Sequence, residues 1–274
     1  MNRLRQFLLL SLIFLSFILL TACGVPSGDP KEVLNKYYEN VKNGNFESAY
    51  EVLAEQNKKN ISKEDFILYE QLNNEIMRLK NFKIEKVRDL KEIKLGGTPY
   101  KYATEFNVTE IIEDYYDDKK EKSNNFTVFV VDDNGTWKVF KDLDIKKAIS
   151  SNLVQLGWMY TEGKGKDKNF NEAAINFKRA LDYDKENADA YYGLGVVYHY
   201  SERYDESIAQ LNLALAKSDD KAFKSDVYNV LGLSYIGKEN YKKAKEAYNK
   251  ALELNPNNEY AKNNLVQLKE FLGE

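Results

Sequence analysis

The feature that most constrains the fold of this 274-residue chain is a five-residue pattern, Leu-Gly-x-x-Tyr, that occurs three times in its second half. The copies begin at Leu156, Leu194 and Leu231, at intervals of 38 and 37 residues. Each copy is followed by a second segment with apolar residues at helical spacing. A period of this length predicts a stack of two-helix units, in which each unit buries its apolar face against its neighbours.

The pattern closely resembles the tetratricopeptide repeat. The positions that carry the resemblance are Leu156, Gly157, Tyr160, Ala180, Leu194, Gly195, Tyr198, Ala214, Leu231, Gly232, Tyr235, Ala251 and Pro256. The resemblance implies an all-α solenoid over 148–274, with repeats at about 150–187, 188–221 and 225–258 and a capping helix at 259–272. We expect small residues where the paired helices cross closely, with Phe177, Leu211 and Tyr248 filling the space between them.

Both intervals exceed the roughly 34 residues of a standard tetratricopeptide repeat. We place the first surplus in the glycine-rich stretch 163–167, which would lengthen the turn inside the first repeat as in the related Sel-type repeats. We place the second surplus at 218–222, between the second and third repeats. The glycine-lysine stretch is not a phosphate-binding loop, because it lacks both the four-residue gap between glycines and a Ser or Thr after the lysine.

In tetratricopeptide repeats the first helix of each pair lines a concave groove, and the resemblance implies which side chains face it here. They include Thr161, Asp189 and Asp226. The candidates for binding a partner are Val154, Trp158, Tyr192, Val196, His199, Asn229, Leu233 and Ile236. The lysine and asparagine clamp with which similar domains hold chaperone C-terminal carboxylates is not reproduced, because Trp158, Val196 and Leu233 stand in its place. We therefore expect an aromatic and aliphatic groove for a protein or peptide partner.

Two alternatives bear on this groove. Part of it could pack against the neighbouring domain or the capping helix, which would leave less surface for a partner. His199, the only histidine in the chain, is open to two interpretations: a polar contact to a bound peptide, or a half-exposed helix residue without a special role. We do not expect it to act as a general base, since that role needs an orienting partner and a nearby nucleophile.

The first half of the chain, residues 30–147, changes from a helical to a two-residue period near residue 80. Asp29 and Pro30 predict the start of the first of three helices, as a capping side chain followed by proline. About four strands follow, and Asn134-Gly135 predicts a type I′ hairpin between the last two. The pattern predicts an α+β domain, with three helices packed on one face of a curved antiparallel sheet.

This half resembles the nuclear transport factor 2-like cone fold, in particular its bacterial lipoprotein versions. The motifs that carry the resemblance are Tyr37-Tyr38, Asn43-Gly44-Asn45, Ala49-Tyr50 and Gly135-Thr136-Trp137-Lys138-Val139. Some relatives of this fold are isomerases or dehydratases, which need an acid–base pair inside the cone. The inward candidates here are aromatic and include no histidine: Tyr37, Tyr50, Phe129 and Trp137. We interpret them as core, with a pocket for a small ligand or cell-envelope fragment as the alternative.

The first 22 residues predict a secretory signal. Arg3 and Arg5 precede a 14-residue apolar run at 7–20, which is short against the roughly 20 residues of a membrane-spanning helix. The exit from this run resembles the bacterial lipobox and reads Leu20, Thr21, Ala22, Cys23. By that resemblance residues 1–22 are removed, Cys23 carries a lipid, and 23–29 form a tether. An ordinary cleaved signal followed by an incidental cysteine is the alternative.

Composition removes several classes of function. The single cysteine excludes an internal disulfide framework and a cysteine-rich zinc site. The acidic residues at 110–118 lack the spacing and the glycine of a calcium loop, so we interpret them as a solvated loop between strands. A net charge of −3, mildly acidic in both halves, disfavours nucleic acid and favours apolar over electrostatic recognition of a partner.

The sequence therefore predicts a non-enzymatic scaffold, without a metal or cofactor, that is anchored by Cys23 to a bacterial cell membrane on its extracytoplasmic face, or to an outer membrane where the host has one. Its repeat groove is expected to bind a protein or peptide partner of the cell envelope. The alternative function is binding of a small ligand or envelope fragment in the cone domain, with the repeats used for assembly.

Overall fold

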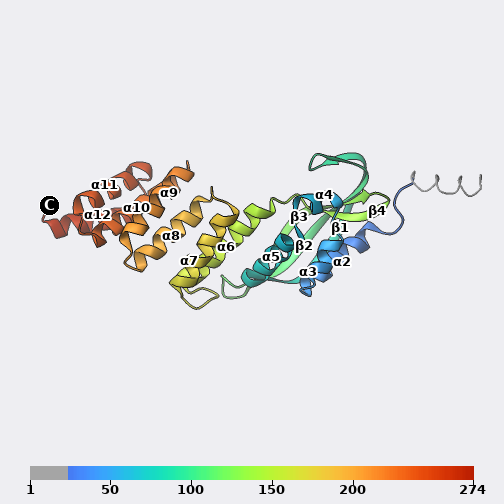
Figure 1. Cartoon of the computed structure of the whole chain (residues 1–274), viewed down its shortest axis with the longest axis horizontal. Helices are drawn as coiled ribbons and strands as arrows, with labels where there is room; N and C mark the ends of the chain where they lie inside the picture. Colours follow the sequence, from blue (N-terminus) through green and yellow to red (C-terminus); the bar gives the residue numbers. More distant parts are fainter. Residues whose placement is uncertain (1–23) are drawn as a thin grey trace, which may run out of the picture. The chain divides into compact units, whose positions relative to one another are not determined.

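The structure is a computed structural model that describes residues 24–274. The predicted signal at 1–22 and the lipobox residues Leu20, Thr21, Ala22 and Cys23 lie outside the described residues. The fold class is confirmed: helices and a four-stranded antiparallel sheet are followed by an all-helical solenoid (Figure 1). Within residues 24–274, no helix is both long and apolar enough to cross a bilayer.

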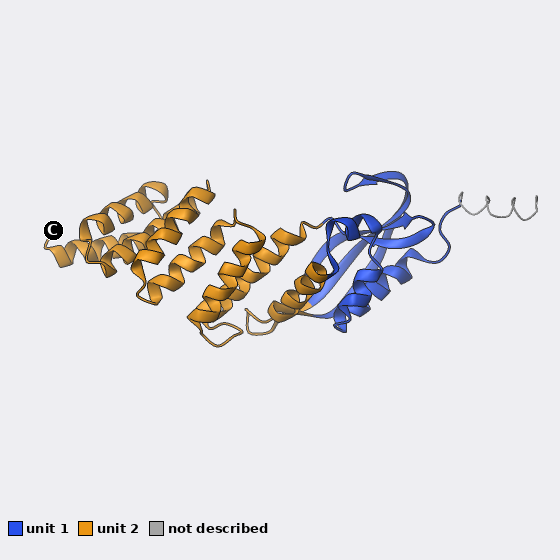
Figure 2. Ribbon diagram, viewed as in Figure 1, with its two compact units in different colours: residues 1–63, 79–111, 123–142 blue, residues 64–78, 112–122, 143–274 orange. Residues whose placement is uncertain are grey.

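The chain divides into two compact units (Figure 2). One unit comprises residues up to 63 together with 79–111 and 123–142, and the other comprises 64–78, 112–122 and 143–274. The second unit thus contains the repeats, helix α5 (Lys63–Ile76) almost entirely, and the turn at 115–119 between two strands of the sheet. The units are not contiguous in sequence, and the predicted boundary after residue 147 stays a prediction.

Helix α2 (Pro30–Lys42) begins as its sequence predicts, because the Asp29 carboxylate accepts a hydrogen bond of 2.8 Å from the Lys31 amide and proline occupies the first turn. The helices α3 (Phe46–Glu51) and α4 (Glu55–Asn60) follow. The prediction of three helices was wrong by one, since the described residues before the sheet form four. Helix α4 is short and polar, so it leaves no apolar periodicity in the sequence.

The sheet is a meander of four strands in the order β1-β2-β3-β4: β1 (Met77–Leu95), β2 (Thr98–Asp114), β3 (Lys120–Asp133) and β4 (Thr136–Phe140). The predicted hairpin is confirmed, since Asn134 and Gly135 have φ values of 55° and 85° and β3 pairs antiparallel with β4. Gly96 and Gly97, also at positive φ, connect β1 to β2 in the same way. Strand β1 begins at Met77, slightly before the change of period that the sequence places near residue 80.

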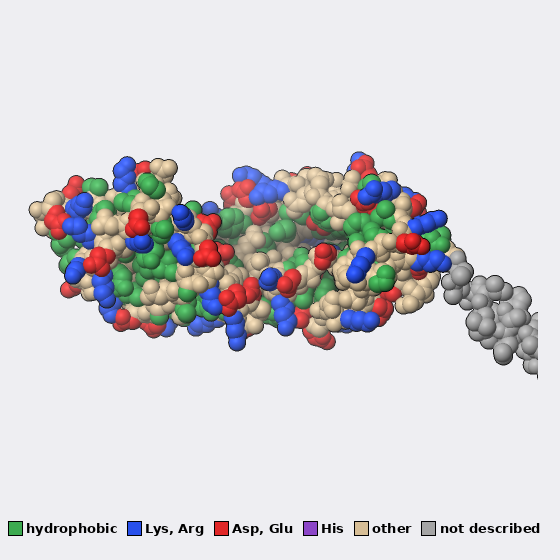
Figure 3. Space-filling view, turned by 90° about the horizontal axis from the view of Figure 1, so that it is seen from above, with side chains coloured by type: hydrophobic (Ala, Val, Ile, Leu, Met, Phe, Trp, Pro, Cys, Tyr) green, Lys and Arg blue, Asp and Glu red, His purple; other side chains and the backbone are tan. Residues whose placement is uncertain are grey.

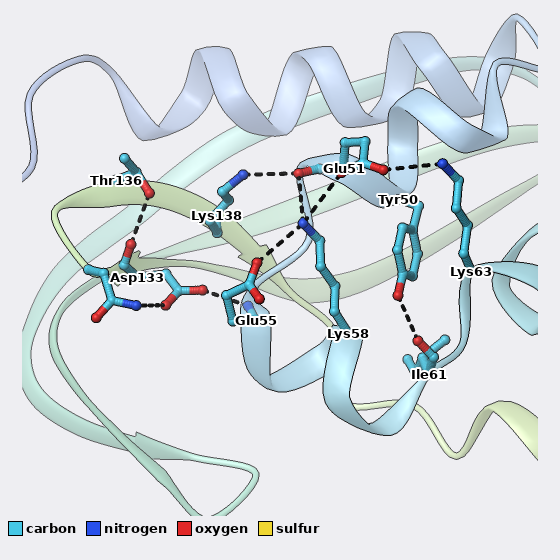
Figure 4. Close-up of polar contacts among 10 residues, drawn as sticks. Tyr50, Glu51, Glu55, Lys58, Ile61, Lys63, Asp133, Thr136 and Lys138 are labelled. Carbon is cyan, nitrogen blue, oxygen red and sulfur yellow. Dashed lines mark hydrogen bonds and ion pairs between the residues drawn. The ribbon is translucent and has the colours of Figure 1, made fainter.

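Hydrogen bonds connect α3 and α4 to the β3–β4 hairpin (Figure 4). Lys138 Nζ donates to the Glu51 carbonyl at 2.9 Å, and the Glu55 amide at the start of α4 donates to Asp133 Oδ2 at 2.6 Å. The segment between the two helices runs beside β4, with bonds of 2.9 Å from the Ala54 amide to the Val139 carbonyl and from the Val139 amide to the Val52 carbonyl. Asp133 therefore caps a helix that has no side-chain cap of its own.

Three of the four aromatics predicted to point inward are buried core residues, and the fourth, Phe129, is partly buried and packs against the core cluster that contains Tyr100. Tyr37 is 1% exposed, and Tyr50 and Trp137 are each 8% exposed. The Tyr50 hydroxyl donates to the Ile61 carbonyl at 2.9 Å (Figure 4), and Lys141 Nζ donates to the Tyr37 hydroxyl at 2.8 Å. Their polar ends are thus satisfied inside the fold, as buried hydroxyls require.

The solenoid consists of three helix pairs and a last helix. These are α6 (Ile145–Glu162) with α7 (Phe170–Tyr183), α8 (Ala188–Tyr200) with α9 (Tyr204–Lys217), α10 (Lys221–Gly237) with α11 (Tyr241–Leu254), and α12 (Glu259–Leu272). Six of these seven helices start at an Asp or Asn whose side chain accepts from the first turn: Asp144, Asn169, Asn187, Asp220, Asn240 and Asn258. Each such cap stabilises its helix by about 1 kcal/mol.

The predicted close crossing of the paired helices is confirmed. A Cβ atom added to Gly157, Gly195 or Gly232 would come within 3.0 Å of the side chain that crosses above it. Those side chains are Phe177, Leu211 and Tyr248, which are at most 1% exposed. Only glycine lets the two backbones of a pair approach so closely.

The surplus residues of the repeats lie in two different kinds of structure. In the first repeat, seven residues (163–169) separate α6 from α7, whereas three residues separate the helices within each later pair. This agrees with the predicted lengthened turn. Before the third repeat, the surplus does not form a longer loop but extends α10 at its N-terminus, since α10 begins ten residues before Leu231 and α8 begins six before Leu194.

Replacing Gly157 by Ala will destabilise the protein by about 1–3 kcal/mol, the usual cost of overpacking, because the new methyl group would lie 2.7 Å from the Phe177 ring. Urea unfolding of the full chain measures this loss. The control is the double variant Gly157→Ala with Phe177→Leu, in which the smaller side chain makes room. A double variant that loses as much as the two single variants together would contradict the close-crossing explanation.

Candidate functional site

The first pocket of the solenoid, about 640 Å³ in volume, opens along the first helices of repeats one and two. Its lining residues are Tyr116, Ser151, Val154, Gln155, Trp158, Glu162, Asn187, Asp189 and Tyr192. It brings together three of the predicted groove residues: Val154 and Trp158 from α6, and Tyr192 from α8. Its volume lies within the range of about 300–1,000 Å³ that is usual for ligand pockets.

The aromatic rings of this first pocket are held by further aromatic contacts. The Trp158 ring centroid lies 5.3 Å from that of Phe177, edge to face, and 5.7 Å from that of Tyr192. Tyr192 in turn lies 5.6 Å from Phe223 of α10, again edge to face. Phe177 and Phe223 thus restrict the motion of the Trp158 and Tyr192 rings. A partner that binds these two rings would lose less conformational entropy, because the side chains are already ordered.

The carboxylates at the first pocket differ in how they are compensated. Burial tends to raise the pKa of Glu162, but hydrogen bonds from the Tyr116 hydroxyl at 2.7 Å and from Lys164 outweigh it and lower that pKa. Burial alone raises the pKa of Asp189, for which no hydrogen bond or ion pair of the side chain is described within 24–274. Burial also raises the pKa of Tyr192, and the charges of Asp226 and Asp189 add to this effect.

The second pocket, about 310 Å³ in volume, lies between the third repeat and the last helix. It holds the predicted groove residues Leu233 and Ile236, and its lining is completed by Tyr241, Tyr248, Asn264, Gln267, Leu268 and Phe271. The predicted groove residue Asn229 is 9% exposed, and its side-chain oxygen accepts a hydrogen bond of 2.8 Å from Asn264 of α12. Here part of the predicted groove packs against the capping helix.

The two remaining predicted groove residues lie between repeats. Val196 is 8% exposed and belongs to a core cluster with Leu211 and Val227. His199 is half-buried, with its ring centroid 5.7 Å from that of Tyr200 and 5.8 Å from that of Tyr204. Its Nδ1 lies 3.3 Å from the Ser234 hydroxyl oxygen of the next repeat. The eight predicted residues are thus divided among two pockets and the inter-repeat packing.

The charged side chains around the β2–β3 turn form ion pairs with one another, and Asp114 among them is only 9% exposed. Strand β2 leads into the β2–β3 turn at 115–119, where Lys122 pairs with Asp114 at 2.7 Å and Lys120 pairs with Asp117 at 2.8 Å. A hydrogen bond from Lys120 lowers the pKa of Asp117. Within residues 24–274, no group of three or more His, Cys, Asp or Glu side chains could hold a metal ion. Figure 3 shows basic and acidic side chains interspersed over one face of the described residues.

Sequence reasoning missed several residues that line the pockets. Tyr116 reaches the first pocket from the β2–β3 turn, although more than thirty residues of sequence separate it from Trp158. Phe271 of the capping helix is 70% exposed and lines the second pocket together with Tyr241. The periodicity of α12 indicates its apolar side but not the contact of that side with α10. No signal in the sequence links Tyr116 to the repeats.

Comparisons with known proteins identify the repeats. Two family models described as tetratricopeptide repeat match residues 225–258 and 188–216, and one described as TPR repeat matches 167–201. The helices that these models match within 167–258 are therefore tetratricopeptide repeats, and α6 pairs with α7 to extend the same stack. A search of curated proteins gives no significant match.

Solved structures of tetratricopeptide domains resemble this part of the chain. The first TPR of Spaghetti (RPAP3) bound to an HSP90 peptide is 22% identical, covers 47% of this chain and 96% of its own, and has a TM-score of 0.42. The Sgt2 TPR domain from Aspergillus fumigatus is 25% identical, with coverages of 46% and 80% and a TM-score of 0.41. MamA is 27% identical, with coverages of 45% and 68% and a TM-score of 0.40.

The half-buried position of His199 makes stability depend on pH. Burial lowers its pKa below the usual value of about 6.5, so the unfolded chain takes up a proton at a higher pH than the folded chain. The contribution to stability is complete above about pH 6.5 and is lost as the pH falls through the folded pKa. We expect the urea midpoint to fall more between pH 7.5 and 5.0 in the wild type than in His199→Gln. Equal falls in the two proteins would contradict this assignment.

Proposed function

We propose that this protein is a non-enzymatic, lipid-anchored scaffold on the extracytoplasmic face of a bacterial membrane, whose tetratricopeptide repeats bind a protein or peptide partner of the cell envelope. The observation that carries the proposal is the first pocket, in which Val154, Trp158 and Tyr192 meet. The repeats themselves are established by their family models, whereas the anchor, the location and the partner are proposed.

The energetics of the first pocket suit a peptide of moderate affinity. Each apolar or aromatic side chain that a partner buries there contributes about 1.5–3 kcal/mol. Two or three such anchors reach micromolar dissociation constants after the costs of ordering the peptide are subtracted. Trp158 and Tyr192 belong to the residue types that dominate protein interfaces.

Site-specific photo-crosslinking in the native host tests the partner-binding role. A photoreactive amino acid at Gln155, which lines the first pocket, is expected to form adducts with one partner, and Tyr192→Ala should reduce their yield about tenfold or more because an aromatic anchor is lost. Tyr192→Phe, which keeps the ring, should retain most of the yield. The same photoreactive residue at Arg179, which is exposed on α7, serves as the control position. Equal adducts from both positions, or a yield unaffected by Tyr192→Ala, would rule out the groove.

The anchor rests on the sequence of residues 20–23, which resembles a lipobox. A lipid-modified cysteine followed by the tether at 23–29 would hold the folded chain at the membrane surface. We expect an alkyne-labelled fatty acid to be incorporated into the wild type and into Ser27→Ala, and to be lost from Cys23→Ala, with the protein then released from the membrane fraction. Label that persists in Cys23→Ala would refute the lipid anchor.

For the N-terminal region we propose a nuclear transport factor 2-like cone domain that acts as a spacer or second docking surface. The proposal is supported by the motifs between Tyr37 and Val139 that resemble this fold, and by a four-stranded meander whose last strand contains Trp137. Binding of a small ligand there is the alternative. It is favoured by the Tyr100 hydroxyl, which is buried beside Ala103, Val131 and Phe140 and has no hydrogen-bond partner within residues 24–274. A ligand with an acceptor atom would satisfy that hydroxyl, which otherwise costs about 1–3 kcal/mol.

A further inference from the structure

We infer that the partner segment that enters the first pocket carries a lysine or arginine side chain, which lies against the rings of Trp158 and Tyr192 and pairs with the carboxylate of Asp189, with Asp226 adding a second negative charge nearby. This inference deepens the proposed function and rests on it. It specifies a cationic peptide, in contrast to the purely apolar recognition that the sequence predicts.

The first evidence is the sign of the charges at the first pocket. Its lining contains two carboxylates, Glu162 and Asp189, and no lysine or arginine. Glu162 is already compensated, because Lys164 lies 3.0 Å from it and the Tyr116 hydroxyl donates to it. Asp189 has no such partner among the described residues, so it is the carboxylate left open to a ligand.

Asp226 reinforces the charge of Asp189. It occupies the same position in α10 as Asp189 does in α8, 37 residues earlier, which is also the interval between Leu194 and Leu231. The only described hydrogen bond of its side chain comes from the neutral amide of Asn258, at 2.9 Å. The negative charges of both carboxylates add to the effect of burial and raise the pKa of the Tyr192 hydroxyl. No cation of the described chain is paired with either of them.

Asp189 and Asp226 are exposed, although neighbouring residues displace part of the water around each carboxylate. Burial raises the pKa of Asp189 and, against an opposing hydrogen bond from Asn258, that of Asp226. An exposed carboxylate that has lost part of its hydration and has no ion-pair partner attracts a bound ammonium or guanidinium group. An acidic peptide would instead bring like charges together, which disfavours it at this pocket.

Besides the carboxylates, the aromatic rings of Trp158 and Tyr192 would contribute to binding a cation. Trp158 and Tyr192 lie 5.7 Å apart with their planes tilted by 48°, and Tyr192 is three residues after Asp189 on α8. Residues three apart share one face of a helix, so the ring and the carboxylate are neighbours. A cation near an aromatic face is attracted by the ring, most strongly by Trp. The aliphatic stem of a lysine or arginine would cover the apolar part of the pocket at the same time.

Selection from a library of random 12-residue peptides displayed on phage tests the inference with the full chain as bait. We expect lysine and arginine to be enriched several-fold in peptides selected by the wild type, and this enrichment to disappear with the double variant Asp189→Asn, Asp226→Asn. Asparagine keeps the shape of aspartate and removes its charge. The matched control carries Asp182→Asn and Glu246→Gln, which remove two exposed charges on the second helices α7 and α11 and should leave the enrichment intact.

A synthetic peptide from the selection then gives the energetic measurement. Replacing its lysine or arginine by glutamine should weaken binding to the wild type about tenfold, the loss of one charge-assisted contact, and should leave binding to the double aspartate variant unchanged. Circular dichroism confirms that each variant is folded.

The possible outcomes separate this inference from the proposed function. Selected peptides that are neutral or acidic, or that bind the double variant as well as the wild type, would overturn the cationic segment while leaving a peptide-binding groove. A selection in which no peptide is enriched by the wild type over the bare support would overturn both.

Discussion

The close crossing of the two helices within each repeat is the constraint on which the solenoid depends. Gly157, Gly195 and Gly232 lie directly under buried large side chains, so no side chain longer than a hydrogen atom fits at those positions. Each glycine is followed at once by a residue that points to another side of the first helix, namely Trp158, Val196 and Leu233. The crossing therefore fixes the rotation of each first helix, and with it the side chains that the helix presents to the groove.

Small differences between the repeats place equivalent groove positions in different surroundings. The seven-residue turn of the first repeat and the additional turn at the start of α10 change the neighbours of otherwise equivalent positions. The Asn side chain that starts the next helix bonds to Ser150 in the first repeat and to Ser225 in the third, at 2.9 Å in both. The equivalent residue of the second repeat is Ala188, which has no hydroxyl. Repeats with one shared pattern thus supply a first pocket along α6 and α8, a second pocket bounded by the capping helix, and a packed region between them.

The parts of the fold that follow from local physics could be predicted from the sequence. Asn134-Gly135 specified a hairpin because both residues adopt positive φ, and the Leu-Gly-x-x-Tyr pattern specified the helix pairs because glycine is needed where they cross. Helix α4 escaped prediction because its cap, Asp133, comes from a distant hairpin. Tyr116 and the contact of Asn264 with Asn229 escaped for the same reason: each depends on residues brought together only by tertiary folding.

Charge shows most clearly why composition alone misleads about recognition. A net charge of −3, from 40 basic and 43 acidic residues, suggests that a partner is not captured by electrostatic attraction. The net charge is an average over the whole chain, however, and it does not describe the charge at any one site. On the described surface many charges cancel locally, as in the pairs of Lys120 with Asp117 and Arg203 with Glu206. Asp189 and Asp226 have no such ion-pair partner among the described residues, and Asp189 lines the first pocket together with Tyr192. A ligand responds to that local imbalance, because water and salt screen charges beyond about 10 Å.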